Sequence, residues 1–324
     1  MKTIGIFCGG FSSEYAISLN STNTIISHFP LGYSWIKIIV KKGAWETETE
    51  HGVKGTFNVN TGAVESSTET TRIDAGLIYI HGDPGENGKL QGTLDLLGIP
   101  YVNSDALASS LSFDKWYCNQ FLKSFNIPVA QSIFLKKGEP YDIHNMVEAL
   151  GLPLFIKPTN SGSSYGISKI KEVHAMEAGI ETAFREGDRI VLESFLEGTE
   201  VTCGVYRTKD GIKALPLTEI VSQNEFFDYE AKYLGKSEEI VPARIDDQLA
   251  GHIQEASKRI YELLNLRSIA RIDFIICQKG PFVIEVNTTP GFSNESIVPK
   301  MLACAGIEIR DFWTEIFDVE LAFR

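Results

Sequence analysis

Two neighbouring stretches near the end of the chain constrain its fold most strongly. Residues 270–276 (ARIDFII) and residues 282–287 (FVIEVN) alternate apolar and polar side chains, which predicts two β-strands with one polar face each. The short polar segment of residues 278–280 (QKG) predicts a hairpin loop, so that Cys277 pairs with Pro281. The chain therefore ends in a unit built on an antiparallel hairpin.

This register gathers four functional side chains on one face. Asp273 falls opposite Glu285, and Arg271 falls opposite Asn287. Like charges that face each other destabilise a sheet, so a cation is expected between the two carboxylates. Carboxylate and amide oxygens are ligands that Mg2+ accepts in proteins. The alternative is a solvated polar face, which the apolar residues flanking both strands disfavour because buried carboxylates need partners.

Length, charge and cysteine content limit the function classes. The chain has 324 residues, of which 43% are hydrophobic, so it can bury a large core divided among two or three domains. The net charge of -12 and the absence of a Lys/Arg cluster argue against nucleic-acid or anionic-membrane partners. Five scattered cysteines without a CxxC pair predict neither disulfides nor a zinc site. Without a signal-peptide core or a membrane-length apolar run, we expect a cytoplasmic protein.

The first hundred residues predict an α/β domain. A strand over residues 3–7, a helix that begins near residues 12–14 and an apolar strand over residues 76–80 indicate a doubly wound parallel sheet. The loop HGDPGENG at residues 81–88 follows a strand end, where such sheets bind ligands. The G-x-G-x-x-G spacing of dinucleotide-binding proteins is missing. We expect only a small surface hairpin in residues 44–72.

The middle of the chain changes character near Ser104. Helices with an Asp at each N-cap are predicted for residues 105–113 and 114–125. A strand through Lys157 leads into a Gly/Ser-rich tip at residues 159–166, whose N–H and hydroxyl groups are suited to bind phosphate, although plain turns share this composition.

Further signals lie in the second half of the chain. The aromatic and charged segment 226–235 suits a mobile loop over a site, or else an ordinary surface loop. A strong amphipathic helix is predicted for residues 246–266, with Asp246 or Asp247 as its N-cap.

Seven motifs, in this order, resemble the ATP-grasp D-alanine:D-alanine ligases. They span nearly the whole chain and read GGFSSEYAISL, HGDPGENGKLQG, LFIKPTNSGSSYGISK, VLESFLEGTEV, FDYEAKYLG, ARIDF and EVNTTPGFSNESIVP. The resemblance implies an N-terminal substrate-binding α/β domain (residues 1–103) with a doubly wound parallel sheet. A two-part α+β ATP-grasp region with antiparallel sheets would follow, divided into residues 104–194 and 195–324. It also implies a homodimer.

The resemblance further implies a role for individual residues. Asp273, Glu285 and Asn287 would bind two Mg2+ (or Mn2+) ions, while Arg271 and the Gly291 N–H would face an oxyanion. Glu14 and His81 would bind the first D-alanine, and Ser296 the second. A hydrogen-bonded set would consist of Glu14, Ser163 and Tyr233. The implied ATP site comprises Lys115, Lys157, Ser163, Glu193, Leu196, Glu200 and Lys232.

The implied reaction joins two D-alanines through an acyl phosphate, with ATP as the phosphoryl donor, for peptidoglycan precursor synthesis. Retention of Glu-Ala-Lys-Tyr at residues 230–233 favours the dipeptide product, whereas Thr289, Phe292 and Glu295 depart from the commonest family residues. The same chemistry with D-serine, D-lactate or another amino acid as second substrate is therefore the near alternative. A nucleotide-dependent oxidoreductase and a catalytically inactive ATP-binding module are the remote ones.

Overall fold

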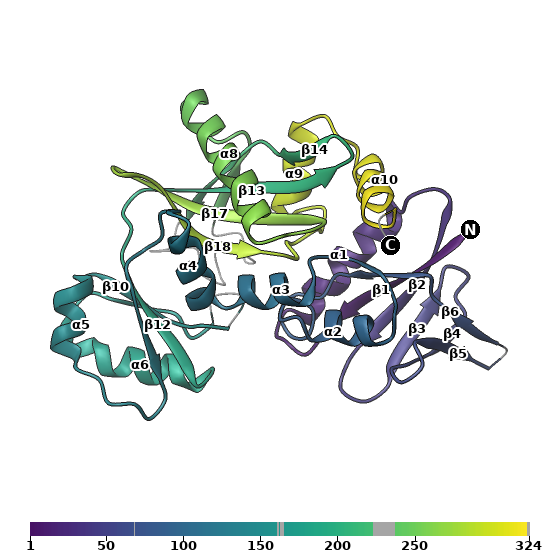
Figure 1. Cartoon of the computed structure of the whole chain (residues 1–324), viewed down its shortest axis with the longest axis horizontal. Coiled ribbons are helices and arrows are strands. Elements are labelled where there is room, and N and C mark those ends of the chain that lie inside the picture. The colour runs from purple at the N-terminus through teal and green to yellow at the C-terminus, as the bar shows by residue number, and fades with distance from the viewer. Residues whose placement is uncertain (68, 161, 163–164, 223–236, 323–324) are drawn as a thin grey trace.

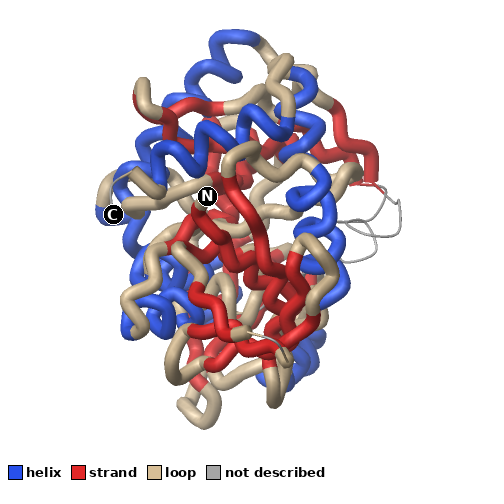
Figure 2. The backbone as a smooth tube through the Cα atoms, turned by 90° about the vertical axis from the view of Figure 1, so that its right-hand side faces the viewer, coloured by secondary structure: helices blue, strands red, loops and turns tan. Residues whose placement is uncertain are grey.

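Three β-sheets organise the chain in the computed structural model, which describes residues 1–322 except 68, 161, 163–164 and 223–236. The first sheet lies at the right of Figure 1, the second at the left and the third above and between them. In the perpendicular view of Figure 2 the strands gather in the middle of the molecule and most helices lie around them. In the described part of the chain, no helix has both the length and the apolar character that crossing a bilayer requires.

The first sheet has eight strands in the order β6-β5-β4-β3-β2-β1-β7-β8. Strands β2, β1, β7 and β8 pair in parallel, which confirms the doubly wound core, and the others pair antiparallel. Helices α1 (Tyr15–Ser27) and α2 (Lys89–Leu96) connect its parallel strands. The strands are β1 (Lys2–Gly9), β2 (Tyr33–Val40), β3 (Trp45–Thr49), β4 (Lys54–Asn58), β5 (Ala63–Ser66), β6 (Thr70–Arg72), β7 (Ala75–Ile78) and β8 (Tyr101–Val102).

Strands β3 to β6 correct our expectation of a small surface hairpin in residues 44–72. They form a meander that extends the sheet. The physical reason is aromatic packing: the rings of Trp45 and Phe57 stack with centroids 5.7 Å apart, and both meet Phe7 of β1 edge to face. These side chains thus give the meander an apolar core that a surface hairpin lacks.

The second sheet is wholly antiparallel, as expected, and has the order β11-β10-β12-β9. Its own apolar cluster includes Leu154, Ile156 and Ile180. The strands are β9 (Ser132–Lys136), β10 (Leu154–Pro158), β11 (Ser168–Ile170) and β12 (Arg189–Ser194). The helices are α5 (Ile143–Leu150), the 3-10 turn η1 (Val173–Ala175) and α6 (Met176–Arg185).

The third sheet has six antiparallel strands in the order β16-β15-β13-β17-β18, with β14 paired to β13. The strands are β13 (Thr199–Thr208), β14 (Gly211–Ala214), β15 (Thr218–Ser222), β16 (Ser237–Ile240), β17 (Ile269–Cys277) and β18 (Gly280–Asn287). Helices α3 (Ala106–Phe113), α4 (Lys115–Ser124) and α8 (Asp247–Leu263) share one apolar cluster with it. Helices α9 (Ile297–Cys304) and α10 (Ile309–Glu320) belong to another.

The β17–β18 hairpin has the predicted pairing at its functional end and a different one at its tip. Cys277 pairs with Gly280, so the loop has two residues and the predicted Cys277–Pro281 pair is wrong. A β-bulge then shifts the register by one residue, which restores Asp273 opposite Glu285. Arg271 opposite Asn287 is likewise confirmed. The bulge turns the polar side chains of both strands to the same face.

The first and third sheets share a hydrophobic core. One cluster joins Ile4 and Tyr79 of the first sheet region to Phe292 and to Trp313 of α10, all of them buried. Helices α3 and α4, which fall within the predicted unit of residues 104–194, pack on the third sheet. The domain limits at residues 103/104 and 194/195 stay a prediction. The shared core holds the loop after β7 against the segment that follows β18.

Candidate active site

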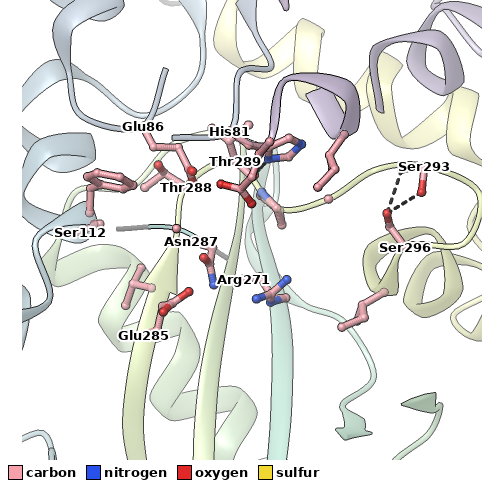
Figure 3. Close-up of a pocket in the computed structure, with 18 of the residues that line it drawn as sticks. His81, Glu86, Ser112, Arg271, Glu285, Asn287, Thr288, Thr289, Ser293 and Ser296 are labelled. Carbon is pink, nitrogen blue, oxygen red and sulfur yellow. Dashed lines mark hydrogen bonds between the residues drawn. The ribbon is translucent and has the colours of Figure 1, made fainter. Parts of the chain in front are cut away.

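A pocket of about 300 Å3 lies where β17 and β18 meet the loops of the first sheet. In Figure 3, Arg271, Glu285 and Asn287 project from the strands toward Glu86 and His81 above them. The structure thus gathers many of the predicted site residues around one cavity. Those that line it are Glu14, His81, Lys115, Arg271, Glu285, Asn287, Gly291 and Ser296.

Charged side chains on β17 and β18 form a tight network at the base of the pocket. Arg271 binds Asp273 in a two-pronged ion pair, with Nε 2.8 Å from Oδ1 and Nη2 2.7 Å from Oδ2. Asn287 Nδ2 donates to Asp273 Oδ2 at 3.1 Å, and the Thr202 hydroxyl donates to Oδ1 at 2.5 Å. Asp273 is almost fully buried, so these partners offset the cost of burying its charge.

Glu285 meets a cation that comes from another part of the chain. Lys115 Nζ, at the start of α4, lies 3.5 Å from Glu285 Oε2. The backbone N–H of Lys115 donates to the carbonyl of Thr159 at 3.0 Å, which ties α4 to the loop after β10. Among the described residues, no group of three or more His, Cys, Asp or Glu side chains is arranged to hold a metal ion. The hairpin itself offers the oxygen atoms of two carboxylates, Asp273 and Glu285, and of one amide, Asn287.

His81 is neutral and hydrogen-bonded through both ring nitrogens. Nδ1 lies 2.8 Å from the Thr289 carbonyl oxygen, which can only accept, so Nδ1 carries the proton. Nε2 then accepts from the Ser21 hydroxyl at 3.2 Å. Burial lowers the pKa of His81, the nearby Glu14 carboxylate opposes that shift, and Arg271 adds to it.

Glu86 is a pocket residue to which the sequence analysis gave no role. It is buried, and its Oε2 accepts a hydrogen bond from the Gly82 N–H at 2.7 Å. Burial, together with the charges of Glu14 and Glu285, raises the pKa of Glu86 to about 8. Its place within the turn of residues 81–88 was the only sequence signal, and nothing local reveals how deeply that turn is buried.

Three of the predicted nucleotide residues, Lys157, Glu193 and Glu200, lie on β10, β12 and β13. Lys157 Nζ forms a buried ion pair with Glu193 Oε2 at 2.7 Å, and Asn119 of α4 donates to Glu193 Oε1 at 2.9 Å. Leu196 and Glu200, in the connector after β12 and on β13, are half-buried and lie outside the residues that line the pocket. The structure thus brings Lys157 and Glu193 together, beside the helix that carries Lys115.

The segment after β18 supplies hydrogen-bond donors to the opposite wall. Ser296 is the N-cap of α9, and its hydroxyl accepts from the Ser293 N–H at 3.0 Å without capping the helix itself. The Ser293 and Ser296 hydroxyls lie 2.8 Å apart, as the dashed line in Figure 3 shows. A helix that begins at the pocket wall offers backbone N–H groups and a positive dipole end, which suit a carboxylate.

Three predicted residues, Ser163, Lys232 and Tyr233, lie outside the described residues. The same holds for the whole of the expected loop over residues 226–235. Gly162 is described and lines the pocket, where an added Cβ would collide with the carboxylate of Glu14. A side chain at this position would therefore require the Glu14 carboxylate to move.

Comparisons with known proteins match the chain from end to end. A family model described as the C-terminus of D-ala D-ala ligase matches residues 121–318, and one described as its N-terminus matches residues 3–104. A D-alanine–D-alanine ligase from Parabacteroides distasonis is 42% identical over 325 residues, which cover 100% of this chain and 98% of the relative.

Two solved structures also resemble the chain along its length. The VanG D-Ala:D-Ser ligase from Enterococcus faecalis has a TM-score of 0.88 at 30% identity and covers 98% of this chain and 99% of its own. A D-alanine–D-alanine ligase from Bacillus anthracis, solved in complex with ATP, has a TM-score of 0.79 at 27% identity. It covers 100% of this chain and 98% of its own.

Proposed function

Because the chain belongs to the D-alanine–D-alanine ligase family, we propose that it joins two D-alanine molecules to D-alanyl-D-alanine for peptidoglycan precursor synthesis. ATP is converted to ADP and phosphate in the reaction. The observation that carries this proposal is that Glu285, Asn287 and Arg271 line the same pocket as Ser296, the N-cap of α9. That combination pairs a site for phosphoryl transfer with a site for an amino-acid carboxylate.

ATP is proposed to bind between β10, β12 and the start of α4. Lys115 and Lys157 neutralise its phosphates, and Lys232, outside the described residues, reaches the γ-phosphate. Glu193 and Leu196 line the adenine side, and Glu200 binds the ribose. The proposal is supported by the buried Lys157–Glu193 ion pair and by the Lys115–Thr159 backbone hydrogen bond, which bring both lysines to one region.

Asp273, Glu285 and Asn287 are proposed to hold two Mg2+ or Mn2+ ions. Their carboxylate and amide oxygens fit these hard cations, and Glu285 and Asn287 line the pocket that would receive the phosphates. Bound there, the ions would neutralise charge on the transferring phosphoryl group. In the structure Arg271 and Lys115 balance the carboxylates, so the hairpin is already arranged to face positive charge.

Glu14 and His81 are proposed to bind the first D-alanine and Ser296 the second. The Glu14 carboxylate pairs with the ammonium of the first D-alanine, and the neutral ring of His81 borders its carboxylate. Ser296 and the first N–H groups of α9 bind the carboxylate of the second D-alanine. The two carboxylates thus lie on different walls of one pocket, which leaves the second amine directed at the first carboxyl carbon.

The reaction is proposed to pass through an acyl phosphate. A carboxylate oxygen of the first D-alanine attacks the γ-phosphorus of ATP and ADP leaves. The neutral amine of the second D-alanine then attacks the acyl carbon, and phosphate departs as the amide bond forms. Arg271 and the Gly291 N–H stabilise the oxyanion between these steps. Ser163 and Tyr233, outside the described residues, complete a hydrogen-bonded set with Glu14.

A D-alanine–D-serine ligase is the second candidate, because the VanG D-Ala:D-Ser ligase resembles the chain over nearly its whole length. Thr289 and Glu295, which depart from the commonest family residues, both line the pocket. The two candidates share every step of the chemistry and differ only in the amine that attacks.

Phosphate release from purified protein with ATP, Mg2+ and D-alanine tests the proposal. We expect turnover that depends on D-alanine, is absent with L-alanine and yields the dipeptide by mass spectrometry. Dipeptide formation only when D-serine is added would favour the second candidate. Absence of ligation for all paired amino and hydroxy acids would contradict both. Light scattering tests the proposed homodimer, and fractionation of cells the proposed cytoplasmic location.

A further inference from the structure

The backbone that carries Gly291 is bound by side chains from the first sheet region. The Tyr79 hydroxyl donates to the Pro290 carbonyl oxygen at 2.8 Å, and His81 Nδ1 donates to the Thr289 carbonyl oxygen at 2.8 Å. Asn103 Nδ2 donates to Thr289 Oγ1 at 3.1 Å. These bonds join residues about two hundred positions apart along the chain. Residues 288–292 are thus held from outside their own sheet.

Tyr79 is buried in a setting that fixes its hydroxyl. Only 2% of its surface is exposed, and its ring lies edge to face with those of Phe292 and Trp313, at centroid distances of 6.0 and 5.8 Å. Burial raises the pKa of Tyr79 well above its ordinary value, so the phenol stays protonated and able to donate. It is not among the residues that line the pocket. The Tyr79 hydroxyl therefore acts on the pocket through the segment it binds, whereas the ring, which Tyr79→Phe keeps, packs edge to face on His81 at a centroid distance of 5.9 Å.

The Pro290 carbonyl and the Gly291 N–H belong to one peptide unit. This unit is planar and trans, so its C=O and N–H point in opposite directions. Tyr79 holds the oxygen on the core side, and the N–H on the other side is then directed away from the core. Gly291 lines the pocket. The hydrogen bond from Tyr79 thus sets the direction of the N–H that the proposed reaction uses.

We propose that Tyr79 is a positioning residue, which orients the Pro290–Gly291 peptide so that its N–H faces the developing oxyanion. Asn103 supports it by anchoring the side chain of Thr289, one residue earlier. This inference rests on the proposed function, because it assigns the oxyanion role to Gly291. Loss of the Tyr79 hydroxyl leaves the Pro290 carbonyl without this partner, so the peptide gains freedom to rotate and turn its N–H away.

Tyr79→Phe tests the inference because it removes only the hydroxyl. We expect kcat for dipeptide synthesis to fall by about tenfold or more, less than for outright loss of an oxyanion donor. The KM for ATP should change little, since the nucleotide residues lie on other elements. Tyr261→Phe is the matched control: the Tyr261 hydroxyl, equally buried, donates to the Ser268 carbonyl at 2.7 Å, away from residues 288–292.

Thr289→Val gives a second test, since it removes the acceptor of Asn103 while keeping the shape of the side chain. It should also lower kcat more than it raises the KM for ATP. Melting temperatures of all three variants show how much each loses in stability. A kcat unchanged in Tyr79→Phe would overturn the inference, as would equal losses in Tyr79→Phe and Tyr261→Phe.

Activity of the wild type distinguishes failure of the proposed function from failure of the positioning role of Tyr79. An active wild type with an unaffected Tyr79→Phe variant overturns the positioning role alone. A wild type that ligates no substrate pair overturns the proposed function and the inference with it. Ligation of D-serine in place of D-alanine leaves the comparison of variants intact, because the oxyanion forms on the first substrate in either case.

Discussion

Two carboxylates that line the same pocket have opposite electrostatic surroundings. Glu285 lies 3.5 Å from the Lys115 ammonium, on the hairpin where Arg271 already binds Asp273. Glu86 has the Gly82 N–H as a partner and lies in the field of other carboxylates, which with burial raises its pKa to about 8. Two glutamates in one pocket therefore differ in charge near neutral pH: Glu285 pairs with a cation, and Glu86 stays protonated.

Glu285→Gln should nearly abolish turnover. The variant keeps the size of the side chain but removes one negative charge from the proposed metal site, so charge on the transferring phosphoryl group is less well neutralised. We expect kcat to fall by about 100-fold or more, with a smaller effect on ATP affinity. Steady-state kinetics and calorimetric titration with ATP measure the two effects. Glu148→Gln, an exposed change on α5, serves as control, and wild-type activity in Glu285→Gln would refute the metal assignment.

Glu86→Gln should change how stability depends on pH. The pKa of Glu86 is about 8 in the folded protein, so the folded protein keeps this proton up to about pH 8, whereas the unfolded chain loses it near the ordinary glutamate pKa of 4.5. The folded state therefore binds more protons in this window, and its stabilisation by that proton is lost as pH rises. Glutamine cannot ionise, so relative to the variant the wild type should lose up to about 1.4 kcal/mol of unfolding free energy per pH unit.

Urea unfolding of wild type and Glu86→Gln at several pH values between these limits measures that difference. The glutamine of the variant keeps an oxygen that can accept the hydrogen bond from the Gly82 N–H, so we expect the folded structure to stay the same. A difference in unfolding free energy that stays constant with pH would contradict the raised pKa of Glu86.

Among the elements, the β17–β18 hairpin and the helix N-caps were the most predictable. Alternation of apolar and polar residues predicted the two strands, and the Asp273–Glu285 pair is confirmed although the predicted loop is one residue too long, because the bulge compensates for that difference. The N-caps of α3, α4 and α8 are the predicted Asp105, Asp114 and Asp246, each of which accepts backbone N–H bonds. The bulge in β18 was not predictable, because a bulge with a two-residue loop preserves the same facing pairs as a regular hairpin with a three-residue loop.

Asp114→Ala should affect both stability and ATP binding. Asp114 caps α4 by accepting from the Tyr117 N–H at 3.2 Å, and its other oxygen lies 3.2 Å from Arg189 Nη1. Loss of the cap should cost about 1 kcal/mol of unfolding free energy. Because Lys115 is the first residue of α4, we also expect a higher KM for ATP.

A matched substitution separates these effects. Asp142→Ala removes the N-cap of α5, where Asp142 accepts from the His144 N–H at 2.8 Å, far along the chain from Lys115. It should lower stability by a similar amount and leave the KM for ATP unchanged. Equal changes in KM for the two variants would argue against a role for the start of α4 in ATP binding.

On the scale of the whole molecule, the first and third sheets depend on a single core. Trp313 of α10 packs against Phe292 and Tyr79 with ring centroids 5.0 and 5.8 Å apart. The second sheet has a separate core that includes Ile180 of α6. We infer that the first and third sheets, which form the walls of the pocket, unfold together. The second sheet has its own core, so we infer that it unfolds separately.

Trp313→Ala should destabilise the first and third sheets together. Removal of this fully buried side chain should cost about 3–5 kcal/mol. Hydrogen exchange should accelerate in β1 and in β13 alike, although Trp313 belongs to neither. In Ile180→Ala, faster exchange should stay within the second sheet. Unchanged exchange in β1 of the Trp313→Ala variant would contradict a common core.

The sequence by itself determined the local features of this protein: the alternation of its strands, the N-caps of its helices and the presence of the β17–β18 hairpin. These follow from interactions between residues that are close along the chain or paired across one turn. Only the tertiary structure decided the raised pKa of Glu86 and the contact of Tyr79 with Pro290, 211 residues apart. Both depend on burial and on distant segments brought together, and those properties arise only when the sheets pack on a shared core.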